Sequence, residues 1–199
     1  MVRMEASDAA QVAQALAGDQ DAFRALVERH SRSLFRLAYR MTGNEHDAEE
    51  VVQETFLRAY RCLNRFESRA SFGTWIYRIG VNCSLDLMRK VRTERSQKVT
   101  DDSAEELDIM ERMPSEDPAP DRLLLSTELR GHVAAALDTL SATERAAFVL
   151  RHFEGRSIEE IGKTLGLRAS ATKNSVFRAV QKLRRALEPH VQSLPSRAQ

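Results

Sequence analysis

Ser157-Ile-Glu-Glu-Ile-Gly-Lys-Thr-Leu165 is followed by Gly166 and then by a longer basic segment, Ser170-Ala-Thr-Lys-Asn-Ser-Val-Phe-Arg-Ala-Val-Gln-Lys-Leu-Arg-Arg185. Ser157 and Glu160 have the spacing of a capping box, which predicts a short helix over residues 158–165. Gly166 is the residue type that most often ends a helix, so a second helix is expected from about residue 170 to Glu188, before Pro189. A short helix, a glycine turn and a longer basic helix form the layout of a helix-turn-helix.

The longer of these helices is predicted to have one apolar face and one basic face. Its aliphatic side chains share one side: Val176, Val180, Leu183 and Leu187. Cations and an amide share the other side: Asn174, Arg178, Lys182 and Arg185. Three further polar residues lie near its N-terminal end, where the helix dipole favours phosphate: Arg168, Thr172 and Lys173.

This basic face has the residue types that a helix in the major groove of DNA requires. Cations contact phosphates there, and Asn or Arg contacts the edges of bases. The alternative is a solvated basic face of a small helical bundle. The preceding short helix and the glycine turn favour the DNA-binding interpretation.

The rest of the chain also has helical periodicity and no competing strand pattern. Apolar spacing predicts helices over residues 7–18, with Ser7-Asp8 as the cap, and over 21–41, 45–63 and from 71 past 89. Further helices are expected over residues 122–140 and, after a second capping box at Ser141 and Glu144, over 145–153. With 8 glycines, 5 prolines and 6% aromatic residues, the composition argues against an all-β sandwich. We predict an all-α fold.

The charge is unevenly distributed, although the net charge of the chain is only +1. Residues 101–121 contain nine acidic side chains and one basic side chain. A stretch with so much charge and so few large apolar residues cannot bury enough surface to offset the entropy lost on ordering. We predict a flexible acidic linker over residues 93–121, which joins two small helical domains at residues 1–92 and 122–199. The alternative is a long solvated loop within one domain.

The predicted helix from residue 71 has a polar face suited to unpaired bases. Phe72, Ile76, Ile79, Cys83 and Leu87 share one side, and Trp75, Arg78, Asn82, Asp86 and Arg89 share another. An indole, a guanidinium and an amide in a row can stack on unpaired bases and hydrogen-bond to them. The loop Phe66-Glu-Ser-Arg-Ala70 adds an aromatic ring with a polar rim. For Trp75 the alternative is a core side chain, which is the commoner fate of a single helical tryptophan.

No active site or metal site is visible in the sequence. His46, Glu50 and Glu54 are spaced four apart, but the Glu-x-x-His pairs of di-metal bundles are absent. This acidic face is either solvated or docks on a basic partner. Neither a nucleophile elbow nor a phosphate-binding glycine loop occurs, so we expect no catalytic residue, no metal and no cofactor.

The compartment follows from what the chain lacks. Two cysteines, Cys62 and Cys83, are too few for a disulfide framework. No apolar run is long enough to predict a membrane span, and the first residues have no apolar signal core. We expect a cytoplasmic protein that does not insert into a membrane.

Two blocks of this sequence resemble bacterial extracytoplasmic-function (ECF) sigma factors. The first is similar to region two of that family and includes Gly43-Asn-Glu-His-Asp-Ala-Glu-Glu-Val-Val-Gln-Glu-Thr-Phe56 and Ser71-Phe-Gly-Thr-Trp-Ile-Tyr-Arg-Ile-Gly-Val-Asn-Cys-Ser-Leu-Asp86. The second is similar to region four and includes Leu140-Ser-Ala-Thr-Glu-Arg145 and Phe153-Glu-Gly-Arg-Ser-Ile-Glu-Glu-Ile161. The resemblance covers residues 21–92 and 122–188, in order around the acidic linker.

The resemblance implies a factor that binds core RNA polymerase and directs it to promoters. Region two would then capture the melted −10 element. Glu50, Gln53 and Glu54 match positions that dock on the clamp helices of the largest polymerase subunit. Phe66, Arg78 and Asn82 match the pocket for flipped −10 bases, and Glu67, Ser68 and Arg69 belong to the specificity loop that runs to Ser71.

For region four, the resemblance implies that the −35 element is read as duplex DNA. Lys173, Asn174, Phe177 and Arg178 match the −35-reading positions. The acidic linker resembles the family segment that threads past the active centre of the polymerase, where negative charge can mimic RNA. An anti-sigma factor that sequesters the chain is a further expectation from the family.

The sequence departs from the family pattern in several places, and Thr172-Lys-Asn-Ser-Val-Phe177 replaces the usual Val-Lys-Ser-Arg-Leu-Phe run. Ser175 and Val180 stand where arginines are common, and Gly73 and Gly80 replace bulkier residues or alanine. Two other function classes remain open at this point. The first is a helix-turn-helix regulator that acts without polymerase, which a core-polymerase binding assay would distinguish. The second is a carboxylate metalloenzyme, which metal analysis would address.

Overall fold

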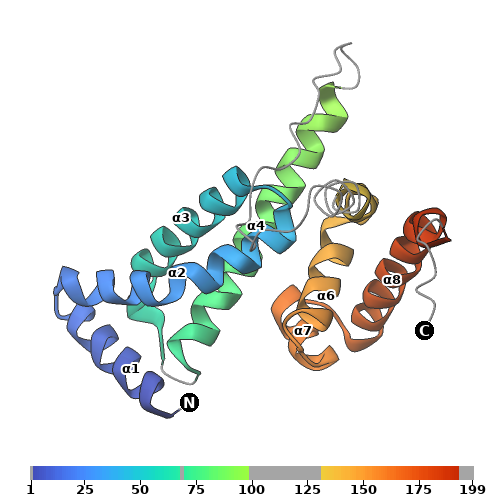
Figure 1. Cartoon of the computed structure of the whole chain (residues 1–199). Helices are drawn as coiled ribbons and strands as arrows, with labels where there is room; N and C mark the ends of the chain where they lie inside the picture. Colours follow the sequence, from blue (N-terminus) through green and yellow to red (C-terminus); the bar gives the residue numbers. More distant parts are fainter. Residues whose placement is uncertain (1, 68–69, 99–130, 193–199) are drawn as a thin grey trace, which may run out of the picture. The chain divides into compact units, whose positions relative to one another are not determined.

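The computed structural model describes residues 2–67, 70–98 and 131–192, and within these ranges every regular element is a helix (Figure 1). The chain divides into two compact units, residues 1–100 and 101–199. The predicted all-α fold with two helical domains is confirmed. Residues 99–121 of the predicted linker, and 122–130 of the helix expected after it, lie outside the described residues. Among the helices described, none combines the length and the apolarity that a membrane crossing needs.

The first unit contains α1 (Val2–Leu16), α2 (Gln20–Thr42), α3 (Glu45–Arg61), η1 (Leu63–Arg65) and α4 (Phe72–Lys98). Local signals set the helix boundaries. The Asp19 side chain accepts hydrogen bonds from two backbone N–H groups in the first turn of α2, and the Asn44 side chain accepts one from the backbone N–H of Asp47 in the first turn of α3. Gly43 ends α2 with a φ of 92°, a left-handed conformation that glycine adopts without strain.

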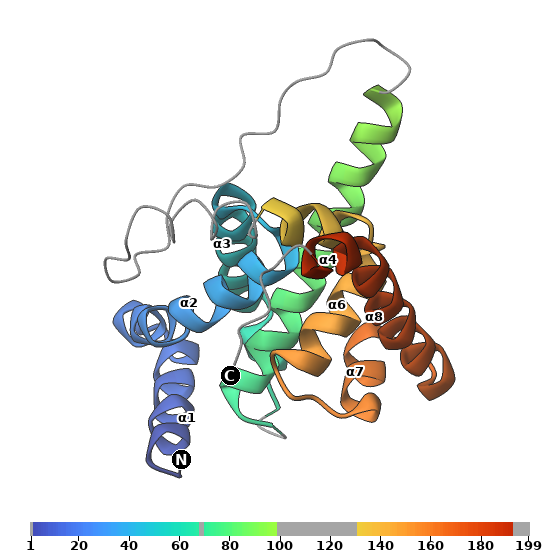
Figure 2. The ribbon, with the colours of Figure 1, turned by 45° about the vertical axis from the view of Figure 1, so that its right-hand side comes forward.

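The core of the first unit lies where α2, α3 and α4 pack together, with α1 added against α2 (Figure 1). The largest side chains in this unit with almost no exposed surface are Leu26, Leu37, Met41, Phe72 and Ile76. The C-terminal turns of α4 extend beyond α2 and α3 in Figures 1 and 2. The core therefore holds the first half of α4, which carries Arg78 and Asn82.

Three boundaries in this unit differ from the predictions. α1 begins at Val2, and Asp8 is not its cap, because the Asp8 carboxylate is buried and bonded to α2. α3 ends at Arg61, and Leu63 enters the core from a short 3-10 turn. α4 continues to Lys98, so the residues from 93 to 98 that we assigned to the linker are helical.

The described part of the second unit comprises a helical stretch over residues 131–138, α6 (Ala142–His152), α7 (Ile158–Leu165) and α8 (Ala169–Gln192). Both predicted capping boxes are present. Ser141 pairs reciprocally with Glu144, and Ser157 pairs reciprocally with Glu160. The core cluster that joins the first stretch to α8 consists of Ala136, Leu140, Ala179 and Leu183.

The prediction that the last helix ends before Pro189 is wrong, because α8 continues to Gln192. A proline lacks an N–H group and removes one backbone hydrogen bond, here the bond to the carbonyl of Arg185. Arg185 and Pro189 are both exposed, so water can replace that bond and the turn that follows can still form.

Candidate nucleic-acid and partner interfaces

Two glycines build the turn between α7 and α8. Gly166 ends α7 with a φ of 67°, and its backbone N–H donates to the carbonyl of Gly162. At Gly162 itself, a Cβ atom would lie 2.8 Å from the carbonyl oxygen of Leu167 and 3.2 Å from Thr172 Oγ1. Only a residue without a side chain allows this close approach, so the two glycines define the geometry of the helix-turn-helix.

The outer side of α8 carries the residues predicted to contact DNA. Arg168, just before the helix, and Lys173, Asn174 and Arg178 on it are exposed. Phe177 is 60% exposed, which is a large fraction for a phenylalanine. Cations, an amide and an aromatic ring therefore share the surface of α8 that faces away from the core.

Thr172 corrects one part of the predicted DNA-binding set. It is 0% exposed, and its hydroxyl donates to the carbonyl oxygen of Arg168 at 3.1 Å. Thr172 lies four residues before Val176 and seven before Ala179, so it continues the apolar stripe of α8 into the core. That spacing is present in the sequence and identifies Thr172 as a packing residue of the turn.

Lys182 was also expected on the basic face, but its ammonium group binds within the unit. Lys182 Nζ donates to Glu144 Oε2 at 2.7 Å, which ties α8 to the start of α6. Burial by itself would raise the pKa of Glu144. The hydrogen bonds from Lys182 and Ser141 outweigh burial and hold the pKa of Glu144 below its ordinary value. Lys182 therefore fixes the orientation of α8 on α6.

In the first unit, Phe66 belongs to an aromatic cluster at the start of α4. Its ring centroid lies 5.8 Å from that of Phe72 and 5.2 Å from that of Trp75. Phe72 is buried, whereas Phe66 and Trp75 are half-buried against the core. Of the two interpretations of Trp75, the structure supports the core side chain.

The described polar residues predicted for −10 binding lie further along α4 and next to Phe66. Arg78 and Asn82 are exposed and one helical turn apart on α4, and Glu67 is exposed next to Phe66. Ser68 and Arg69 lie outside the described residues. Ser71 caps α4, with its hydroxyl accepting from the backbone N–H of Thr74 at 3.2 Å. The structure thus brings Phe66 to the N-terminal end of the helix that carries Arg78 and Asn82.

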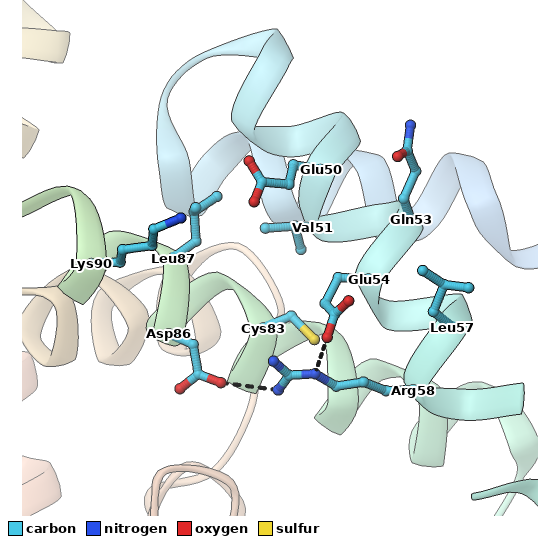
Figure 3. A pocket seen from close by; sticks show the side chains of 10 residues that line it. All are labelled: Glu50, Val51, Gln53, Glu54, Leu57, Arg58, Cys83, Asp86, Leu87 and Lys90. Carbon is cyan, nitrogen blue, oxygen red and sulfur yellow. Dashed lines mark hydrogen bonds and ion pairs between the residues drawn. The ribbon is translucent and has the colours of Figure 1, made fainter. Parts of the chain in front are cut away.

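A groove between α3 and α4 brings together the three residues predicted to dock on polymerase (Figure 3). It is lined by Glu50, Val51, Gln53, Glu54, Leu57, Arg58, Cys83, Asp86, Leu87 and Lys90. Leu57 is 51% exposed and was missed by the sequence reasoning. It lies seven residues after Glu50, on the same stripe of α3, so the helical spacing could have found it.

Arg58 ties the two walls of the groove together. Its Nε donates to Glu54 Oε1 at 2.6 Å, and its Nη1 donates to Asp86 Oδ2 at 2.9 Å (Figure 3). These bonds to Glu54 and Asp86 raise the pKa of Arg58 above its ordinary value. Burial raises the pKa of the Cys83 thiol. Within the part of the chain that the structure describes, no three His, Cys, Asp or Glu side chains are grouped to hold a metal ion.

Both units match known sequence families. Residues 26–94 match Sigma-70 region 2, and residues 131–183 match Sigma-70, region 4. The ECF RNA polymerase sigma factor SigE of Mycolicibacterium smegmatis is 38% identical over 87% of this chain, and the match spans 65% of that relative's length. The ECF RNA polymerase sigma factor SigW of Bacillus subtilis is 31% identical over 85% of this chain and 91% of its own length.

A solved structure agrees with these matches. The sigma factor RpoE from Bartonella quintana, determined in complex with the anti-sigma factor NepR, is similar with a TM-score of 0.61 and 25% sequence identity. The similarity covers 83% of this chain and 96% of that one. With both sigma regions in their family order and with relatives matched over most of its length, this chain belongs to the ECF RNA polymerase sigma factors.

Proposed function

We propose that this sigma factor binds core RNA polymerase through the groove between α3 and α4, captures melted −10 bases at α4, and reads the −35 duplex with α8. The observation that carries the proposal is the groove, which gathers Glu50, Gln53 and Glu54 on one exposed surface. A regulator that acted without polymerase would need only α7 and α8, and nothing would require this surface in the first unit.

The composition of the groove suits a protein partner. An exposed leucine, Leu57, lies among carboxylates and an amide, and apolar residues within a polar surround are typical of contact surfaces between proteins. The Glu54 carboxylate already forms an ion pair with Arg58. The Glu50 side chain is exposed. Glu50 is therefore the carboxylate best able to meet a basic surface on the polymerase.

The remaining proposals follow from the same assignment. The two units act as separate domains joined by the acidic linker, and the protein is a cytoplasmic, non-enzymatic factor without a cofactor. An anti-sigma factor is a proposed partner, in line with the Bartonella relative that was solved with one.

The docking proposal is tested by charge reversal at one residue with a matched control. Glu50→Lys places a like charge against a basic partner surface, so its affinity for core polymerase should fall at least tenfold, a typical cost for a close charge contact. Glu49→Lys changes the same charge next to the groove residue, and Glu49 is exposed but does not line the groove. Equal affinities of the two variants in a core-binding titration would move the docking surface elsewhere.

The −10 proposal is tested at Asn82. An amide can pair with the Watson–Crick edge of a base only after that base has left the duplex. Asn82→Ala should therefore retain core binding and −35 binding but lose open complexes, with a milder loss on a template already mismatched across the −10 region. Permanganate reactivity on both templates measures this, and normal melting of the duplex promoter by the variant would remove Asn82 from the mechanism.

A further inference from the structure

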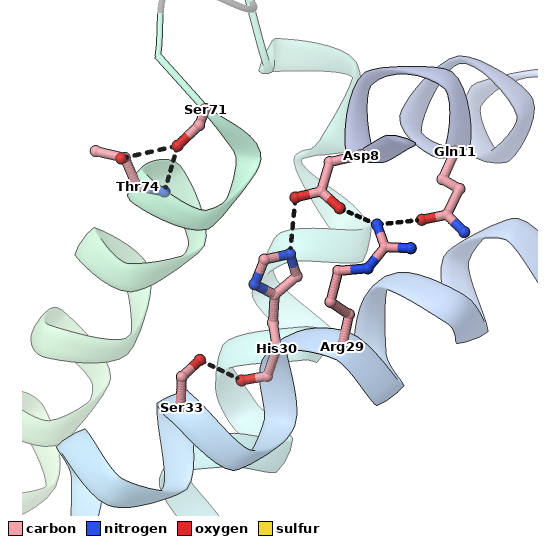
Figure 4. A network of polar contacts seen from close by, with 7 residues as sticks. All are labelled: Asp8, Gln11, Arg29, His30, Ser33, Ser71 and Thr74. Carbon is pink, nitrogen blue, oxygen red and sulfur yellow. Dashed lines mark hydrogen bonds and ion pairs between the residues drawn. The ribbon is translucent and has the colours of Figure 1, made fainter. Parts of the chain in front are cut away.

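A buried carboxylate links α1 to α2 in the first unit. Asp8 is 6% exposed, and both of its carboxylate oxygens are hydrogen-bonded to α2 (Figure 4). One oxygen accepts from Arg29, which also donates to Gln11 at 2.9 Å, and the other accepts from His30 Nε2 at 2.9 Å. A buried carboxylate costs stability unless it is paired in this way, so the network fixes α1 on α2.

His30 carries this network to the start of α4. Its ring centroid lies 5.4 Å from that of Phe72, and its side chain is only 13% exposed. Gly73 leaves room for the imidazole, because a Cβ atom there would lie 3.3 Å from His30 Cε1. The imidazole therefore lies between the Asp8 carboxylate on one side and the first turn of α4 on the other.

Phe72 then connects the imidazole to the proposed −10 surface. The centroid of its ring lies 5.8 Å from that of Phe66, with the two rings edge-on, and 5.6 Å from that of Trp75. Because Phe72 is 2% exposed, it cannot move without moving its neighbours. A displacement of His30 should reach Phe66 through this one ring.

We propose that Asp8 and His30 are positioning residues for −10 recognition. Asp8 orients the imidazole, the imidazole supports Phe72, and Phe72 sets the position of Phe66 and of the first turns of α4. The inference rests on the proposed −10 function and extends it to α1, which precedes residue 26, where the match to Sigma-70 region 2 begins. The N-terminal helix would thus contribute to promoter opening without touching DNA.

Trp75 allows the first step to be tested without DNA or polymerase. It is the single tryptophan of the chain and lies in the cluster with Phe66 and Phe72. We expect His30→Leu to increase the acrylamide quenching of Trp75 in the full-length protein at a temperature where the protein is folded. Gly73→Ala should change the quenching as well, because its methyl group displaces the imidazole while leaving Asp8 intact.

Arg29→Met is the matched control, because Arg29 holds the same carboxylate from the side facing Gln11. It should lower the melting temperature about as much as His30→Leu does, with little change in Trp75 quenching. In complex with core polymerase, His30→Leu should reduce open-complex formation on a duplex promoter about fivefold, within the range of couplings carried by packed side chains. Core affinity and −35 duplex affinity should stay at the wild-type level.

Three results separate the possibilities. Unchanged Trp75 quenching in His30→Leu overturns the proposal, whatever happens at the promoter. Equal effects of His30→Leu and Arg29→Met on quenching and on opening also overturn it, since the network would then serve stability alone. If Trp75 responds as expected but the wild-type protein opens no promoter, the proposed function fails while the link from His30 to the aromatic cluster stands.

Discussion

The two units position their exposed faces by different means. In the second unit, α7, the turn and the start of α8 are adjacent in sequence, and one capping box and two glycines determine their geometry. In the first unit, the −10 end of α4 depends on side chains from separate parts of the chain, because Phe72 of α4 contacts both His30 of α2 and Phe66, which follows η1. The first arrangement relies on backbone geometry, and the second relies on packed rings.

The glycines show the same contrast. At Gly162 the nearest obstacle to a Cβ atom is a backbone carbonyl oxygen, whereas at Gly80 it is Leu34 Cδ2, at 2.9 Å. A backbone atom in a tight turn cannot move alone, but the end of a leucine side chain can change its rotamer. The second unit should therefore tolerate less change at its closest contact than the first unit does.

Gly162→Ala should have the largest effect on stability. Overpacking against a backbone oxygen destabilises by about 3 kcal/mol, and the better helix propensity of alanine offsets about 1 kcal/mol of this. The free energy of unfolding of the second unit should therefore fall by about 2 kcal/mol. Hydrogen exchange on the full-length protein would report this loss separately for each unit. If the amide groups of α7 and α8 are protected from exchange as in the wild type, the turn accommodates the added methyl group more easily than the comparison implies.

Arg178→Ala should weaken binding to a −35 duplex about tenfold, as expected for one lost base or phosphate contact. Arg78→Ala removes the same charge in the first unit. It should leave duplex affinity unchanged, because its proposed contacts form only with melted bases. Fluorescence anisotropy across a salt series would distinguish the two roles of Arg178, since loss of a phosphate contact lowers the salt slope by about one. Equal losses in the two variants would remove the functional difference between the units.

Lys182→Met should cost the second unit about 1 kcal/mol, because a charge-assisted bond to a buried carboxylate is lost from a lysine that is itself 44% exposed. The folded-state pKa of Glu144 lies below its ordinary value of 4.5. Its stabilising contribution is therefore fully present above pH 4.5 and is lost as the pH falls through the lower, folded-state pKa. Below pH 4.5, the melting temperature of the wild type should fall more steeply with decreasing pH than that of Lys182→Met. The same pH dependence in both proteins would contradict the ion pair.

Gly80→Ala should have the smallest effect. Overpacking against the end of Leu34 costs about 1 kcal/mol, and helix propensity returns about the same amount, so the net change should be close to zero. Urea unfolding of the wild type and the variant measures it. A loss as large as that of Gly162→Ala would show that the first unit is packed as rigidly as the helix-turn-helix.

Much of the fold could be predicted because its signals are local. The capping boxes at Ser141 and Ser157 require only residues three apart, and the helical period is visible in any short stretch of sequence. Pro189 was misjudged because one missing backbone bond at an exposed helix end is a small cost. Asn174 and Arg178 on the exposed face of α8 were predicted in the same way, from spacing along one helix, whereas Glu50, Gln53 and Glu54 of the groove were predicted from the resemblance to a family.

The sequence by itself determined the all-α class, the helix-turn-helix and the exposed polar rows, because these depend on residues within a few turns of one another. Only the tertiary structure decided which polar side chains bond to other side chains of the same chain. Lys182 binds Glu144, 38 residues away, and Asp8 binds His30, 22 residues away. Such pairs form only when separate helices pack together, and burial then makes the bond between them obligatory.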